Sequence, residues 1–146
     1  MSKEMRDALV AVLDCLIPED AARGLPSAGA LGLAGYVAER LGDALASLAP
    51  GFAALDAAAQ QRDARRFAEL DTREAREVLR RYAERDAGFL PALVFHAYAG
   101  YYQNPAVLEA LGMEGRPPHP KGYELEAGDL GLLDPVRGRA PLYREI

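Results

Sequence analysis

The sequence predicts an all-α protein: a compact bundle of five to six helices with a long extended C-terminal tail rich in Pro and Gly. Apolar residues recur at helical spacing through the first 111 residues, and no stretch alternates as a strand would. The helical pattern then stops, and 35 residues follow from Gly112 to Ile146. We expect one structural domain, with helices over 1–111 and a tail over 112–146 that packs on this domain, on a partner or on both.

The first two helices follow from apolar spacing. Residues 3–17 carry one stripe, and Pro18 ends it because proline disfavours helical geometry in the residue before it. Ser27 is a predicted N-cap for the second helix, which ends at Pro50 and Gly51. The stripes are Met5, Leu9, Val12, Leu13 and Leu16, then Ala34, Val37, Leu41, Leu45 and Leu48.

The third and fourth helices differ in how much of each is apolar. The third, Phe52 to Leu70, is polar from Gln60 to Arg66, so we expect it on the outside of the bundle. Asp71 and Glu74 have the spacing of a capping box and open the fourth helix. Its predicted inner face is Ala75, Val78, Leu79 and Tyr82.

The fifth helix is the most apolar of the chain and follows Gly88. Large apolar residues surround it on nearly all sides, which is typical of a centrally buried helix. We therefore expect the core to be built around it. Asn104 and Pro105 then predict an N-cap and a first helical residue for a short sixth helix that closes at Gly112.

The tail contains too many large apolar side chains for a simple linker. Disordered segments stay disordered because they lack apolar surface to bury, and a structureless stretch of this length is uncommon in a compact domain. A second protein is the natural supplier of the surface that the tail needs. The large apolar residues are Tyr123, Leu125, Leu130, Leu132, Leu133, Leu142 and Tyr143.

Composition excludes several classes of protein. A single cysteine, Cys15, rules out an internal disulfide and any site with several cysteine ligands. The net charge is −5, and basic residues alternate with acidic ones as on a solvated helix face, so we expect no nucleic-acid binding. The apolar runs are too short for a membrane segment, and the N-terminus has no leader pattern, so we expect a cytoplasmic protein.

No set of residues predicts catalysis, a cofactor site or a metal site. Neither His96 nor His119 has a second metal ligand at a suitable spacing. We interpret His96 as an imidazole in the core or at its edge, and His119 as a group that packs or contacts a partner. We expect Cys15 in the core. We expect Glu19 and Asp20 to act as caps in the loop that ends the first helix. Tyr98, Tyr101 and Tyr102 are expected mainly in the core, where their hydroxyls need partners.

Three short segments resemble the gluconate 2-dehydrogenase subunit 3 family. Leu16 to Asp20 followed by Ser27 to Ala30 resembles the opening of the family pattern. Phe89 to Pro105, which ends in Gly-Tyr-Tyr-Gln-Asn-Pro, is similar to its aromatic signature. Pro118 to Tyr123 is similar to its Pro-Gly-Tyr region. The chain departs from the family pattern in two ways. It shows no twin-arginine leader, and Ala106 to Leu111 replace a segment that is often rich in glycine in the family.

The resemblance implies a non-catalytic accessory subunit that stabilises or matures a large flavoprotein of the glucose-methanol-choline type, acting on a sugar or polyol. FAD is then expected in the partner and no cofactor in this chain. The departures favour an intracellular complex and a substrate other than gluconate. The residues expected to contact the partner are Tyr101, Tyr102, Asn104, Pro105, His119, Pro120, Tyr123, Leu132, Leu133 and Tyr143.

An alternative function remains open from the residues alone. The chain could be an enzyme or a helical ligand-binding domain whose pocket is lined by Tyr98, Tyr101, Tyr102 and His96. Such a site would show these polar groups converging in a deep pocket. A homo-oligomer whose tails pack on its own copies is a third hypothesis.

Overall fold

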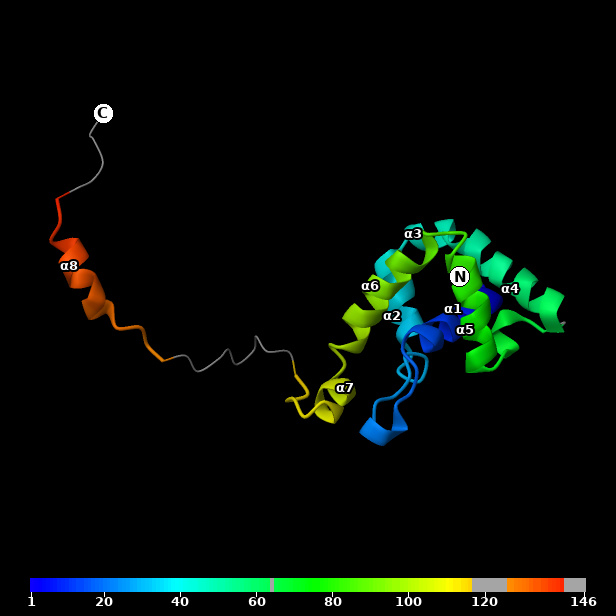
Figure 1. Ribbon diagram of the computed structural model, residues 1–146, viewed down its shortest axis with the longest axis horizontal. Helices are drawn as coiled ribbons and strands as arrows, with labels where there is room; N and C mark the ends of the chain where they lie inside the picture. The colour runs from blue at the N-terminus through cyan, green and yellow to red at the C-terminus, as the bar shows by residue number, and fades with distance from the viewer. Residues whose placement is uncertain (64, 117–125, 141–146) are drawn as a thin grey trace, which may run out of the picture. The chain divides into compact units, whose positions relative to one another are not determined.

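The computed structural model describes residues 1–63, 65–116 and 126–140, and it is all-α, as the sequence predicts (Figure 1). The chain divides into two units, Met1–Arg116 and Pro117–Ile146, which we describe separately. Within the described ranges there is no strand, and one isolated bridge joins Asp20 to Leu25.

The first unit contains seven α-helices, one more than the five to six predicted. They are α1 (Lys3–Leu16), α2 (Leu33–Leu41), α3 (Ala44–Ser47), α4 (Ala49–Asp63), α5 (Thr72–Ala83), α6 (Phe89–Tyr101) and α7 (Pro105–Ala110). Two 3-10 turns, η1 (Ala21–Arg23) and η2 (Phe67–Glu69), lie between them. The second unit contains η3 (Leu130–Leu133) and α8 (Asp134–Arg137).

Helix α1 is the centre of the first unit. It contacts α2, α4, α5 and α6, and Leu9, Val12 and Leu13 are completely buried. The predicted central position of the fifth helix is therefore wrong. Helix α6 packs mainly against α2 and buries one side, while Phe95 on its other side is 69% exposed. Apolar residues on every side of a helix do not show which side is buried against the rest of the chain.

The second predicted helix is interrupted, which accounts for the extra element. It ends at Gly42, whose φ of 51° favours glycine, and the short α3 follows. Pro50 and Gly51 were predicted to end the second helix, but they lie in the first turn of α4. Proline is tolerated there because the first amides of a helix have no intrahelical partner. A Cβ at Gly51 would collide with the Phe89 ring, so glycine permits this contact.

The loop between α1 and α2 is fixed by one side chain of its own and by one from α1. The Ser27 hydroxyl accepts a hydrogen bond from the Ala30 amide and so caps a turn, whereas α2 itself begins at Leu33. The Asp14 carboxylate of α1 accepts a 2.6 Å hydrogen bond from the Gly29 amide. These contacts hold the loop against the bundle.

Other predicted helix ends are confirmed. Asp71 and Glu74 form the capping box of α5. Asn104 accepts a hydrogen bond from the Ala106 amide, with Pro105 at the first helical position of α7. Gly112 follows α7 with a φ of 76°. These ends were predictable because capping depends on local sequence.

Candidate partner-binding surface

One side of α6 presents aromatic rings to solvent. Phe95, Tyr98 and Tyr102 stand at positions i, i+3 and i+7 and are 69%, 42% and 52% exposed. The rings of Tyr98 and Tyr102 stack with centroids 5.9 Å apart and planes 7° apart. We call these three residues the aromatic face. Large rings gathered on one helix side are typical of a protein interface, where Tyr and Phe are enriched.

The opposite side of α6 holds the aromatic face in place. Tyr101 is 2% exposed, and its hydroxyl donates a 2.8 Å hydrogen bond to the carbonyl of Pro26. Gly100 lies against the Tyr36 ring and Leu33, so α2 and α6 approach closely at this point. The aromatic face is thus presented by a helix whose other side is packed, and little ordering is needed on binding.

The predicted contact residues around α6 fall into different environments. Tyr102 and Pro105 are exposed. Asn104 is half-buried and caps α7. Tyr101 lies in the core, where its hydroxyl has the partner that the sequence analysis required. Its role in the first unit is to support the aromatic face from beneath.

The second unit places two predicted contact residues on a short helical segment. Leu132 and Leu133 in η3 are 75% and 46% exposed, and Leu130 and Val136 beside them are also exposed. We call these four residues the tail cluster. Asp129 accepts a hydrogen bond from the Gly131 amide and starts the segment. His119, Pro120, Tyr123 and Tyr143 lie outside the described residues.

The sequence analysis did not identify Phe95 and Tyr98 as surface residues. Their helical spacing from Tyr102 can be read in the sequence. The other sides of the helix have apolar residues at the same spacing, so the pattern does not show which side is exposed. His96 is half-buried at the edge of the face, with its ring 5.2 Å from that of Phe95, in agreement with an edge imidazole. Among the described residues, no group of three His, Cys, Asp or Glu side chains could hold a metal ion.

The side chains proposed for a Tyr/His pocket do not converge. The Tyr101 hydroxyl points into the core at Pro26, whereas Tyr98 and Tyr102 lie on the exposed side of α6. Asp20 accepts a hydrogen bond from the Arg23 amide and caps η1, in agreement with its interpretation as a cap. The observed placements therefore do not favour the ligand-binding alternative.

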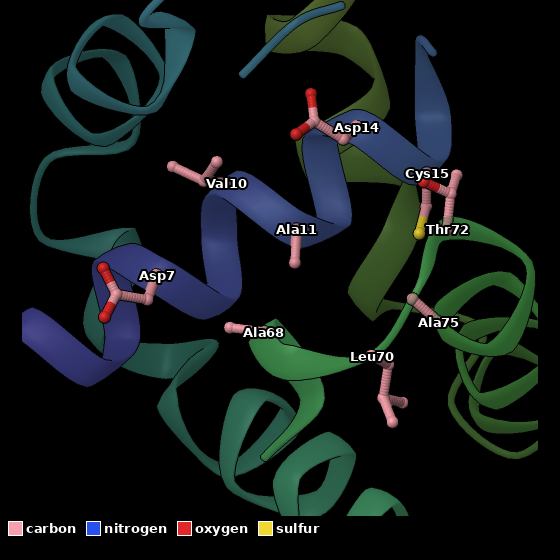
Figure 2. Close-up of a pocket in the computed structure, with 9 residues that line it drawn as sticks. All are labelled: Asp7, Val10, Ala11, Asp14, Cys15, Ala68, Leu70, Thr72 and Ala75. Carbon is pink, nitrogen blue, oxygen red and sulfur yellow. The ribbon is translucent and has the colours of Figure 1, made fainter. Parts of the chain in front are cut away.

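A separate hollow of about 340 Å³ lies between α1 and the segment from η2 to α5 (Figure 2). It exposes little of Cys15, which is 8% accessible. Burial raises the pKa of the Cys15 thiol to about 11, so the group stays protonated and is a poor nucleophile near neutral pH. The expectation that Cys15 belongs to the core is confirmed. The lining residues are Asp7, Val10, Ala11, Asp14, Cys15, Ala68, Leu70, Thr72 and Ala75.

The helices of the described ranges are too short or too polar for a transmembrane span: none is both long and apolar enough to cross a bilayer.

Comparison with known protein families identifies a match to most of the first unit. The model of the family described as Gluconate 2-dehydrogenase subunit 3 matches residues 3–114, which include every helix from α1 to α7. No curated protein and no solved structure matches the chain.

Proposed function

Because the chain belongs to the gluconate 2-dehydrogenase subunit 3 family, we propose that it is a non-catalytic accessory subunit of a flavin-dependent dehydrogenase. Its partner is a large flavoprotein of the glucose-methanol-choline type that oxidises a sugar or polyol. The partner holds the FAD, and this chain stabilises or matures it. The cytoplasmic location expected from the sequence stays a prediction.

The aromatic face is the observation that carries the proposal. Phe95 and Tyr102 expose more than half of their surface on a helix with a packed opposite side. Full burial of one large apolar side chain is worth about 1.5–3 kcal/mol. Clusters of a few aromatic residues often supply most of the free energy of a protein interface. Covering this face therefore contributes a few kcal/mol to the free energy of a contact.

The tail cluster supplies a second contact in the proposal. Its four large apolar residues stand on a hydrogen-bonded segment with an acidic cap, in which Asp134 also pairs with Arg137 at 3.1 Å. Short amphipathic helices commonly bind in grooves of a partner. Two contacts on one chain raise the overall affinity because the second forms at a high effective concentration. The contacts expected of His119, Pro120, Tyr123 and Tyr143 stay predictions.

The proposal is tested first by whether a neighbouring gene encodes a flavoprotein of the glucose-methanol-choline type, and then by co-expression of the chain with that flavoprotein. The wild-type chain should co-purify and raise the yield of FAD-loaded, active flavoprotein. Phe95→Ala with Tyr102→Ala should lower recovery of the complex at least tenfold, because two exposed rings leave the interface. The melting temperature of the free chain should change little, since both rings are already more than half exposed.

Tyr102→Phe is the matched control, because it keeps the ring and its stacking on Tyr98. It should retain most of the binding. A yellow, active protein obtained from this chain alone would contradict the proposed function. Equal recovery with the double alanine variant would remove the aromatic face from the interface.

A further inference from the structure

A groove lies along the α4–α5 helix pair and shares no residue with the aromatic face. The two helices run in opposite directions, because Gly51 at the start of α4 is beside Tyr82 near the end of α5. The volume of the groove is about 630 Å³. Figure 1 shows α4 and α5 as neighbours in the first unit. The groove is lined by Ala54, Ala58, Gln61, Arg62, Glu77, Val78, Arg81, Tyr82 and Arg85.

The lining residues recur every three to four positions on both helices, so the groove follows the helix axes. From Glu77 to Arg85 it extends over about 12 Å, at 1.5 Å of rise per residue. This length accommodates two turns of another helix. Ala54, Ala58 and Val78 give it a floor of short apolar side chains, which allow a second backbone to approach closely.

The rim of the groove is positively charged. Arg62 and Arg85 make no side-chain hydrogen bond or ion pair with any described residue. Arg81 donates to Glu77 at 2.7 Å, and Arg80 donates to the same carboxylate. These two arginines lower the pKa of Glu77. Three guanidinium groups and one carboxylate therefore leave a local charge of +2 on a chain whose net charge is −5.

The positive charge continues past Arg62. A second hollow of about 670 Å³ is lined by four arginines and two carboxylates. They are Arg62, Arg73, Arg76 and Arg80, with Glu74, which pairs with Arg65, and Glu77, which pairs with Arg80 and Arg81. Arg76 donates to the neutral carbonyl of Cys15, so this hydrogen bond leaves its charge uncompensated. Arg73 has no side-chain partner among the described residues. The flank of α5 thus presents several guanidinium groups that a carboxylate-bearing surface can pair with in bidentate geometry.

We propose that this arginine-rimmed groove binds an acidic amphipathic helix of the flavoprotein partner, an inference that rests on the proposed function. The apolar side of that helix lies on Ala54, Ala58 and Val78, and its carboxylates pair with Arg62 and Arg85 at the two ends. A nucleic-acid backbone fits less well, because its phosphates would meet an apolar floor and the Glu77 carboxylate.

The test is a charge reversal, Arg62→Glu with Arg85→Glu, in the full-length chain. Affinity for the flavoprotein used in the co-expression test is measured by titration from 0.05 to 0.5 M salt. The variant should raise Kd at least tenfold at low salt and flatten the dependence of Kd on salt, because rim charges act mainly through electrostatic attraction. The control Lys3→Glu with Arg6→Glu makes the same change in net charge at exposed residues of α1 outside the groove and outside the tail.

The outcomes separate this inference from the proposed function. If the wild-type chain does not bind the flavoprotein, the proposed function fails. If it binds and the groove variant loses no more affinity than the control, the groove inference is overturned while the function stands. Self-association of the wild-type chain that the groove variant abolishes would assign the groove to a second copy and also overturn the inference. An unchanged circular dichroism melt establishes that the variant is folded.

Discussion

Two glycines in helix interiors have opposite surroundings. A Cβ at Gly100 in α6 would stand 2.7 Å from the Tyr36 ring, whereas a Cβ at Gly35 in α2 would meet nothing within 4 Å. Gly35→Ala should therefore stabilise the fold by about 0.5–1 kcal/mol, through helix propensity. Gly100→Ala should lower stability by about 1–3 kcal/mol, because the Tyr36 ring must move in a packed interface.

Chemical denaturation of both variants measures these changes, and each serves as the other's control. Stabilisation by Gly100→Ala would mean that α2 and α6 are not in close contact. A loss of stability in Gly35→Ala would contradict the open environment of that position.

The Cys15 thiol should be unreactive in the folded chain. With a pKa of about 11, its thiolate population at pH 8 is on the order of one in a thousand. Alkylation by iodoacetamide should be at least a hundredfold slower than in denaturant, as followed by mass spectrometry. Alkylation at the same rate in both states would contradict the burial of the thiol.

The same shift makes stability depend on pH in the alkaline range. The unfolded thiol loses its proton near pH 8.5–9 and the folded one near pH 11, so the folded state holds more protons between these values. The contribution of the Cys15 thiol to the free energy of unfolding is fully present below about pH 8.5 and is lost as the pH rises towards 11. The total contribution is about 2–3 kcal/mol. Cys15→Ser should remove this part of the alkaline dependence.

At the scale of elements, helix ends were the easiest features to predict. The start of α5 depends on Asp71 and Glu74, which exchange hydrogen bonds within one turn. Loops between helices were predicted less well. Ser27 caps a turn instead of α2, because Gly32 with its φ of 69° sets the start of that helix.

The α5 capping box provides a prediction at this scale. Asp71→Ala should destabilise the chain by about 1 kcal/mol, since the Glu74 amide loses its side-chain acceptor. Asp71→Ser keeps an N-cap acceptor and should restore most of the loss. Thermal melts of the two variants measure the difference. Equal losses in both would mean that the charge of Asp71, not its capping hydrogen bond, stabilises α5.

The exposure of α6 could not be predicted from periodicity. Leu93 and Phe95 are equally apolar in the sequence, yet one is fully buried and the other is 69% exposed. Which side is covered depends on where α2 lies, and helical spacing alone does not contain this information. The arginine-rimmed groove was missed for a similar reason. The alternating charges of α5 predicted a solvated face. The structure adds that Arg80 and Arg81 both pair with Glu77, and that Arg62 and Arg85 have no side-chain partner among the described residues.

At the scale of the molecule, the described core belongs to the first unit. Its buried residues run from Ala8 to Leu108, and none comes from 126–140. A 1–116 fragment should therefore keep its helical circular dichroism and melt cooperatively, with a loss of at most about 1–2 kcal/mol. Binding to the flavoprotein should weaken by about a thousandfold, as several large apolar residues are removed. Loss of the helical fold would show that the tail belongs to the core.

The division into units agrees with the extent of the family match, which ends at residue 114. Pro and Gly stop the helical pattern at Gly112, so the sequence predicts a change of character there, whereas the first unit of the structure ends at Arg116. That the helices and the tail form one structural domain stays a prediction. Which surface would cover the apolar residues of the tail could not be predicted, because nothing in the sequence of the tail identifies the residues that would pack against them.

The stacked tyrosines of α6 also give the chain an optical signature. The sequence has seven tyrosines and no tryptophan, so its ultraviolet fluorescence comes from tyrosine alone. Tyr98 and Tyr102 are 42% and 52% exposed on the aromatic face, and a flavin or tryptophan brought close to them would accept their excitation energy. Assembly with a flavoprotein can therefore be followed as quenching of tyrosine emission without an attached label, and Tyr98→Phe with Tyr102→Phe separates the signal of this face from that of the other five tyrosines.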